Sequence, residues 1–241
     1  MTELLLPAGV FLIALLYSSV GHAGASGYIA VMSLLSLAPA FIKPSALVLN
    51  ILVASIASLQ FWRAGHFRWA LFWPFALAAV PLAFVGGTID LPRQAFQWLL
   101  GAVLLYSAWR LMVQARQPLE VKPPHLPLAL LAGGFIGLLS GLTGTGGGIF
   151  LTPLLLFAGW AAPKQAAAVS ALFILLNSAS GLSGWLVSGQ SLPGGLLPLL
   201  LAAGAGGLVG SWLGARQLAP AGIKRFLALV LLIAGAKLLL S

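Results

Sequence analysis

Long apolar stretches, separated by short polar or proline- and glycine-containing segments, follow one another along the whole chain. They run over about 4–38, 44–62, 69–89, 94–113, 126–158, 165–187, 193–215 and 222–240. A helix needs roughly 20 apolar residues to cross the hydrocarbon core of a bilayer, and most of these stretches are close to that length. The pattern therefore predicts an all-α polytopic membrane protein. The first and fifth stretches are too long for a single crossing.

Glycine clusters interrupt these two longest stretches. The first cluster occupies 21–28 and the second occupies 141–148. Each glycine costs about 1 kcal/mol relative to alanine in a helix interior, so the clusters predict breaks that divide each stretch into two shorter helices. Paired breaks at corresponding places in the two halves of a membrane protein are a sequence signature of a transport site.

Composition supports the membrane assignment. Hydrophobic residues make up 61% of the chain and charged residues only 6%, whereas soluble domains carry roughly 25% charged residues. The net charge of +9 is spread singly or in pairs at the ends of the stretches, as loop charges of membrane proteins are. We therefore expect contact with the lipid bilayer and no nucleic-acid partner.

The two halves of the chain resemble each other. Aligning Gly21 with Gly141 also pairs Gly24 with Gly144 and Gly27 with Gly147. When one residue is inserted, Lys43 aligns with Lys164. This correspondence predicts an internal repeat. The expected organisation is a first transmembrane repeat over 1–113, a linker over 114–125 and a second transmembrane repeat over 126–241.

The distribution of basic residues predicts how these repeats are oriented. If the loop from Arg63 to Arg68 is cytoplasmic, the positive-inside rule holds along the chain when each glycine-containing stretch enters and leaves on the same side. Each half then has one re-entrant, glycine-tipped hairpin and three transmembrane helices, so the two repeats have inverted topology. The linker is expected to be cytoplasmic and both termini outside. Lys43 is the exception, because this arrangement leaves it outside.

The tips of such hairpins suit a small anion. The first N–H groups of each second half-helix have no intrahelical acceptor, and the helix dipole places about half a positive charge there. Glycine also lets the backbone approach a ligand closely. The candidate substrate-binding residues are the tip positions and the nearby polar side chains: Gly24, Ser26, Gly27, Asn50, Thr143, Gly144, Thr145, Gly146, Gly147, Gly148, Ser170 and Asn177.

Simpler roles compete with this interpretation. Small residues also allow close helix packing, which is the role we favour for the glycines within 206–214. Asn50 and Asn177 could instead form interhelical hydrogen bonds. His22 is the sole titratable group at a predicted tip, and either proton coupling or a structural role suits it.

Catalytic chemistry is poorly supported. The acidic residues all lie at stretch edges, histidines are scattered and no metal-ligand spacing occurs. We therefore expect neither an enzyme, nor a metal, nor a cofactor.

The second-half motif carries a family resemblance. Gly141-x-x-Gly144-x-Gly146-Gly147-Gly148, followed by Pro153, Pro163-Lys164 and Ala166-Ala167-Ala168-Val169-Ser170, resembles the sulfite exporter TauE/SafE family of bacterial membrane permeases. The first half is a looser match, and Ser170 stands where a threonine is more usual. The resemblance extends over essentially the whole chain. It implies a secondary transporter that moves a small sulfur-containing anion, such as sulfite or a sulfonate, across the bacterial inner membrane.

Two alternatives share this sequence pattern. One is a non-transporting membrane scaffold subunit, and the other is an anion channel of the same architecture. Neither the identity of the anion nor the oligomeric state follows from the pattern.

Overall fold

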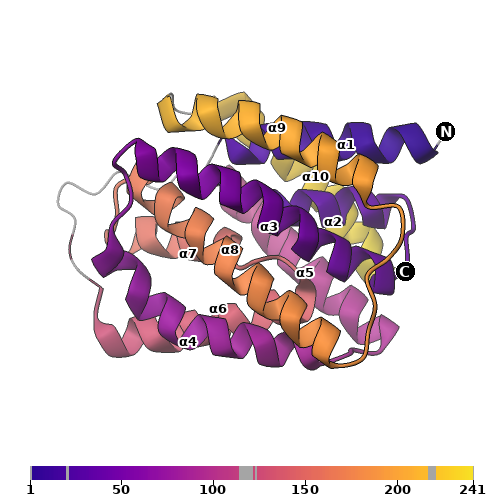
Figure 1. The fold of residues 1–241 in the computed structure, drawn as a ribbon, viewed down its shortest axis with the longest axis horizontal. Coiled ribbons are helices and arrows are strands. Elements are labelled where there is room, and N and C mark those ends of the chain that lie inside the picture. The colour runs from indigo at the N-terminus through magenta and orange to yellow at the C-terminus, as the bar shows by residue number, and fades with distance from the viewer. Residues whose placement is uncertain (1, 20–21, 114–121, 123, 217–220, 241) are drawn as a thin grey trace.

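The computed structural model describes residues 2–19, 22–113, 122, 124–216 and 221–240. This part of the chain forms ten α-helices and no β-strand (Figure 1). In chain order they are α1 (Thr2–Ser18), α2 (Ala25–Leu34), α3 (Pro39–Arg63), α4 (Trp69–Thr88), α5 (Arg93–Met112), α6 (Leu126–Thr143), α7 (Gly148–Phe157), α8 (Pro163–Val187), α9 (Leu197–Arg216) and α10 (Ala221–Leu240). The predicted all-α architecture is confirmed.

The glycine clusters break the two longest stretches as expected. α1 and α2 share the first stretch, α6 and α7 share the fifth, and α2 and α7 have only 10 residues each. Figure 1 shows that α2 runs back toward the end of the molecule where α1 begins, and that α7 runs back toward the end where α6 begins. Gly21 of the first cluster lies outside the described residues.

One predicted helix start was wrong. α3 begins at Pro39 and not near residue 44, because Lys43 and Pro44 belong to the helix and do not precede it. Pro39 occupies the first helical position, where its missing N–H costs no hydrogen bond. Pro44 lies inside the helix, a position that membrane helices tolerate when their neighbours support the backbone.

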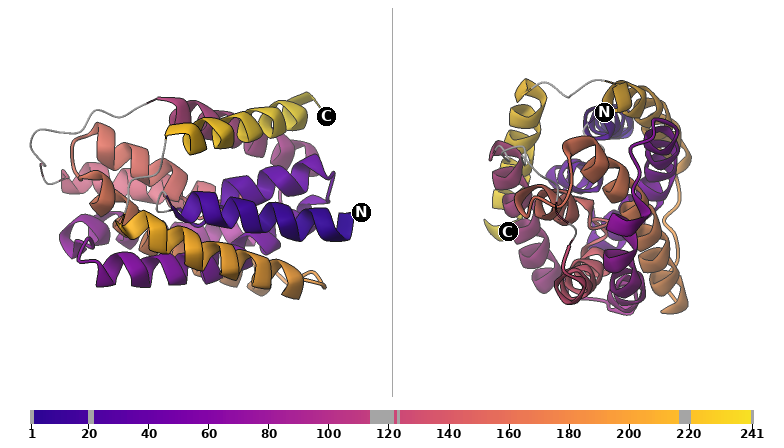
Figure 2. Two further views of the ribbon diagram at one scale, coloured as in Figure 1. Left: turned by 90° about the horizontal axis from the view of Figure 1, so that it is seen from above. Right: turned by 90° about the vertical axis from the view of Figure 1, so that its left-hand side faces the viewer.

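Two ends of the molecule can be distinguished by their contacts (Figures 1 and 2). At one end, Phe67 of the α3–α4 turn packs against Phe61, Ala167, Ala168 and Ala215, which brings the start of α8 and the end of α9 together. The backbone N–H of Lys122 donates to Gly159 there, so we call this the linker end. At the opposite end lie both chain termini, and we call it the termini end.

A lysine caps a neighbouring helix at each end. The Lys43 side chain is only 3% exposed, and its Nζ donates to the carbonyls of Gly86, Gly87 and Ile89 at the end of α4, over 3.1 to 3.3 Å. Lys164 Nζ donates in the same way to the last carbonyls of α9. Terminal helix carbonyls lack intrahelical donors, so each ammonium satisfies them. Lys43 is thus a buried cap and not a loop charge.

Small residues bring three pairs of helices into direct backbone contact. Glycines of α6 lie against α4, where an added Cβ would meet carbonyl oxygens of α4; they are Gly133, Gly137 and Gly141. Glycines of α9 lie against α1 in the same manner; they are Gly206, Gly210 and Gly214. In the α4–α8 pair, Cβ atoms added to Gly87 and Gly184 would meet carbonyl oxygens of the facing helix. Such contacts are a common use of small residues in membrane helices. The packing role expected for the α9 glycines is confirmed.

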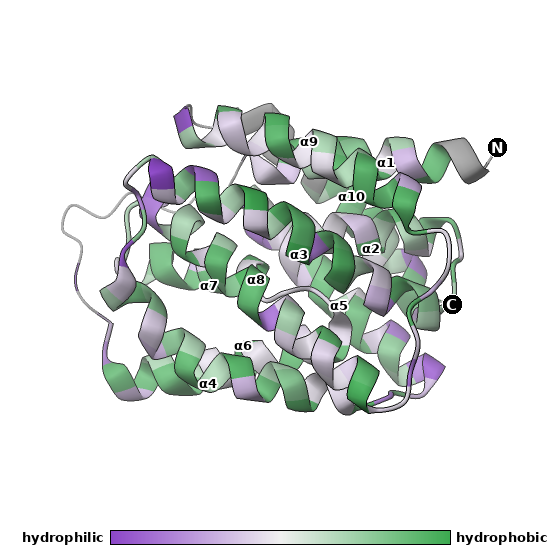
Figure 3. Ribbon diagram, in the orientation of Figure 1, coloured by the Kyte–Doolittle hydropathy of each residue, from purple (hydrophilic) through white to green (hydrophobic). Residues whose placement is uncertain are grey.

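Apolar residues dominate the helices (Figure 3), and the hydrophilic segments gather mainly near the two ends. Within the described residues, five helices are long and apolar enough to cross a membrane, namely α3, α4, α6, α8 and α9. Shorter apolar helices include α2 and α7. The chain therefore has the architecture of a multi-pass membrane protein.

Candidate functional site

The second glycine tip has a backbone that only glycine adopts readily. Gly144, Gly146 and Gly147 have φ values of 80°, 72° and 79°, in the left-handed region that disfavours residues with a Cβ. α7 begins directly after them, at Gly148. The backbone thus bends sharply here, and the N-terminus of a new helix lies inside the protein.

This tip lies against the middle of two long helices. Asn50 of α3 donates through Nδ2 to the carbonyl of Gly144 at 3.4 Å and to Ser178 Oγ of α8 at 3.3 Å. A Cβ added to Gly146 would lie 2.9 Å from Asn50 Nδ2 and from Ser178 Oγ. The backbone of the tip therefore fits directly against polar atoms of α3 and α8, with no room for a side chain.

The first tip reaches the same region. Gly24, which precedes α2, also has a left-handed backbone with φ of 101°. A Cβ added to Gly148 would lie 3.7 Å from Cδ2 of His22. The start of α7 thus adjoins the segment that leads into α2.

Buried polar atoms around the second tip lack partners within the described part of the chain. They are Oδ1 of Asn50, Oγ of Ser140 and both side-chain amide atoms of Asn177, and all three residues are fully buried. Ser140 lies beside Gly147, because a Cβ there would be 3.5 Å from Cβ of Ser140. Folded proteins pair nearly all buried polar atoms with protein or water. Such a group of unpaired atoms is typical of a site that receives water or a polar ligand.

Helix geometry places Asn177 on the face of α8 that meets the tip. Phe173, one turn earlier, would lie 2.9 Å from a Cβ on Gly147, and Gly181, one turn later, packs on the backbone of Gly141. Residues four apart share one face of a helix. We call Asn50, Ser140, Gly144–Gly148, Asn177 and Ser178 the tip cluster.

Sequence comparison identifies the family to which this chain belongs. Residues 6–238 match the family profile described as "Sulfite exporter TauE/SafE". The chain belongs to this family. It is also 40% identical over 234 residues, covering 95% of each chain, to the "Probable membrane transporter protein y4hK" of Sinorhizobium fredii. No solved structure matches. The chain is therefore a membrane transporter of the TauE/SafE family and not an enzyme.

Other predicted site residues of this TauE/SafE transporter have partners within the protein. Ser26 Oγ donates to the Tyr17 hydroxyl at 3.1 Å, and a Cβ on Gly27 would collide with α1. The hydroxyls of Thr143 and Thr145 lie 2.9 Å apart, and Thr143 also donates to the Leu139 carbonyl. Ser170 accepts a hydrogen bond from Thr152 at 2.7 Å. The ligand-binding roles of these residues stay predictions.

Two members of the tip cluster were not among the predicted site residues. Ser140 lies one helical turn before Gly144, and Ser178 directly follows Asn177. Their proximity to predicted residues was the available signal. Whether these two serines face the tip depends on how α3, α6 and α8 cross. The spacing of residues within one helix gives no information about that crossing.

The tip cluster is uncharged. Its donors are amide, hydroxyl and backbone N–H groups, and none of its members is a lysine or arginine. Among the described residues, no group of three or more His, Asp or Glu side chains gathers where a metal ion could bind. The site is therefore suited to reversible binding by hydrogen bonds and helix dipoles.

Proposed function

We propose that this TauE/SafE protein is a secondary transporter that moves a small sulfur-containing anion, such as sulfite or a sulfonate, across the bacterial inner membrane. The observation that carries the proposal is the group of unpaired, fully buried polar atoms on Asn50, Ser140 and Asn177 beside the glycine tip. In this proposal the anion binds between the N-termini of α2 and α7, near the middle of the membrane. The family membership supports transport, and the chemistry of the tip supports an anion.

The donors match the needs of an oxyanion. Its oxygens accept hydrogen bonds from the first N–H groups of α7, the hydroxyl of Ser140 and the amide of Asn177. Asn50 Nδ2 already donates to Gly144, so its Oδ1 accepts a hydrogen bond from a water or from a protonated oxygen of the ligand. Because no lysine or arginine pairs with the anion, release is not slowed by breaking a charge pair.

We also propose that 1–113 and 126–241 are inverted repeats. The two lysine caps support this arrangement, since Lys43 of α3 caps α4 at the termini end while Lys164 of α8 caps α9 at the linker end. The pairing of α4 with α6 is likewise matched by that of α9 with α1. Equivalent elements at opposite ends are what an inverted repeat produces. α1–α2 and α6–α7 would then be the re-entrant hairpins.

The charge distribution predicts the orientation. More of the described basic residues lie at the linker end, namely Arg63, Arg68, Arg110, Lys122, Lys164 and Arg216, than at the termini end, which has Lys43, Arg93 and Lys237. The positive-inside rule places that end in the cytoplasm and both termini outside. Most of the linker, 114–121 and 123, lies outside the described residues.

The orientation can be measured by labelling, because the chain contains no cysteine. We expect Ser191→Cys, at the termini end, to react with a membrane-impermeant maleimide in intact cells. Ala64→Cys, at the linker end, should react only after permeabilisation. The reverse pattern would show that the termini are cytoplasmic.

Flux in liposomes tests the function itself. Purified protein should move labelled sulfite or sulfoacetate faster than empty liposomes do, and Asn177→Leu should lower that flux at least tenfold because an apolar side chain cannot bind the anion. Folding of both proteins is checked by thermal unfolding. If the folded wild-type protein moves none of sulfite, thiosulfate, sulfoacetate, isethionate or sulfate, the scaffold alternative replaces the transporter.

A role for His22 in proton coupling is a further part of the proposal. Its ring lies beside the start of α7, so protonation would add positive charge next to the anion and favour its binding at lower pH. We expect wild-type flux to rise as pH falls, and His22→Gln to flatten this dependence more than it weakens anion binding at one fixed pH. Flux at several imposed pH gradients measures the effect. Identical pH profiles for the two proteins would make His22 structural.

A further inference from the structure

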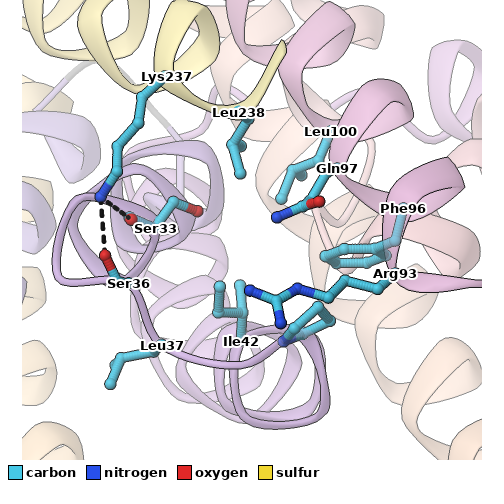
Figure 4. A pocket seen from close by; sticks show the side chains of 11 residues that line it. Ser33, Ser36, Leu37, Ile42, Arg93, Phe96, Gln97, Leu100, Lys237 and Leu238 are labelled. Atoms are coloured by element: carbon cyan, nitrogen blue, oxygen red, sulfur yellow. Dashed lines mark hydrogen bonds between the residues drawn. The ribbon is translucent and has the colours of Figure 1, made fainter. Parts of the chain in front are cut away.

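A polar cavity lies at the termini end, away from the tip cluster. It is enclosed by the end of α2, the starts of α3 and α5, and the end of α10 (Figure 4). Its volume is about 90 Å³, whereas a single water needs roughly 10–15 Å³ of such space. The cavity therefore has room for a four-oxygen anionic group, but not for a large ligand.

Three polar side chains in this cavity have no partner within the described part of the chain. Arg93 and Gln97, at the start of α5, form no hydrogen bond or ion pair with a described residue, and Figure 4 shows both pointing into the open space. Ser33, on the opposite wall, is only 4% exposed, and its Oγ is buried without a hydrogen-bond partner. A guanidinium, a primary amide and a hydroxyl thus converge on one small volume, and all of them can donate hydrogen bonds.

A lysine adds charge to the same wall. Lys237 Nζ donates to the carbonyls of Ser33 and Leu34 and to Ser36 Oγ, at 2.9 to 3.1 Å. These three bonds occupy its protons, so Lys237 contributes charge to the cavity more than direct contacts. Because Ser36 Oγ accepts from this ammonium, its own O–H remains able to donate.

The helix ends around the cavity strengthen its preference for negative charge. α3 and α5 both begin at its wall, and neither start has a side-chain cap or an acidic residue in its first turn. Helix N-termini carry partial positive charge. The negative end of α2 is neutralised by Lys237.

We propose that this cavity, hereafter the outer cavity, is a second binding site that holds the sulfonate, sulfate or phosphate group of an organic anion. The oxyanion group contacts Arg93, Gln97, Ser33 and Ser36. The organic part of the molecule lies along the apolar wall formed by Leu37, Ile42, Phe96 and Leu100. Arginine matches such a group particularly well, because its planar fork binds two oxygens at once.

Two sources can supply this chemistry at the membrane surface. One is a small organosulfonate or phosphate ester from the aqueous phase. The other is the phosphate headgroup of an anionic lipid, whose acyl chains would continue along the apolar wall. Both place the same oxyanion group against the same four side chains, and the experiment distinguishes them.

The binding experiment compares Arg93→Gln with Arg68→Gln. Arg68 is an exposed arginine at the linker end, so it controls for the loss of one positive charge. Equilibrium binding of isethionate and of glycerol phosphate is measured in detergent without anionic lipid. Retention of phosphatidylglycerol is measured by native mass spectrometry from phosphatidylglycerol–phosphatidylcholine nanodiscs. We expect Arg93→Gln to lower binding of at least one probe tenfold or more, Ser33→Ala to lower it severalfold, and Arg68→Gln to change it less than twofold.

Repeating the measurement in a Gly146→Val background separates the outer cavity from the tip cluster. The outer cavity shares no residue with the tip cluster, so binding that depends on Arg93 should persist even when transport is lost. If the wild-type and Arg93→Gln proteins bind every probe equally, or if Gly146→Val removes all binding, the outer cavity is not a binding site. If the wild-type protein shows no flux but does show Arg93-dependent binding, the proposed transport function is overturned and the outer cavity remains a binding site.

Discussion

Gly146→Val is expected to reduce anion flux roughly 100-fold or more, since displacements of about 1 Å in a binding site already have effects of that size. An added Cβ would lie 2.7 Å from Ile174 Cγ2 and 2.9 Å from Asn50 Nδ2 and Ser178 Oγ. The valine would therefore force α3 and α8 apart at the tip cluster and displace Asn50 and Ser178 beside the helix N-terminus. Flux into liposomes, corrected for the amount of inserted protein, measures the loss.

Gly189→Val is the matched control for this substitution. Gly189 has a similar left-handed backbone, with φ of 83°, but an added Cβ meets nothing within 4 Å. Both variants carry the backbone strain of about 1–2 kcal/mol for a residue with a Cβ in this conformation. Only Gly146→Val also displaces side chains of α3 and α8 at the tip. Equal flux in the two variants would assign the importance of Gly146 to backbone strain alone.

Asn50→Asp is expected to lower anion flux by about 1,000-fold at neutral pH. The substitution keeps the shape of the side chain but places a carboxylate beside the bound anion. Two like charges 4 Å apart repel by about 4 kcal/mol at an effective dielectric constant of 20. Because protonation removes this charge, part of the flux should return as the pH is lowered. Initial rates at pH 5 and pH 8 measure both effects.

Gln60→Glu provides the control on the same helix. Gln60 lies in α3 toward the linker end, and its amide donates to the Leu208 carbonyl at 3.2 Å. The same exchange of amide for carboxylate is thus made outside the tip cluster, and flux should stay within a few-fold of the wild-type rate. A wild-type rate for Asn50→Asp at neutral pH would remove Asn50 from the anion site and return it to a purely interhelical role.

Local signals in the sequence were sufficient to predict most of the helices. The glycine clusters mark the breaks after α1 and α6 because glycine acts on the backbone where it stands. The start of α3 was missed because a lysine followed by a proline, at 43–44, is typical of a loop when the sequence alone is considered. Lys43 is compatible with a helix only because the end of α4 supplies carbonyls to its ammonium, a contact between residues more than forty positions apart.

The candidate site was predictable in part for the same reason. Glycines at 144–147 and Asn50 could be selected because a tip and an amide in an apolar helix are unusual on their own. Ser178 stood out only as one of the few polar residues in an apolar stretch, and Ser140 could not be distinguished from other helical serines, which often donate to their own helix, as Ser183 does. What separates them is the crossing of α3, α6 and α8 around the tip.

The glycine contacts between neighbouring helices also have a mechanical consequence. In the α4–α6 pair, Gly137 and Gly141 bring backbone against backbone at Ala79 and Ala83, and α1 with α9 is packed as closely. Sliding within either pair would drive carbonyl oxygens into neighbouring main chain, and interiors packed at this density do not deform continuously. Each pair must therefore move as one rigid body. Gly87 of α4 and Gly184 of α8 join those two helices equally closely. Any motion that exposes the tip cluster first to one side of the membrane and then to the other has to be taken up between the α4–α6–α8 group and the α1–α9 pair, and in their connecting loops.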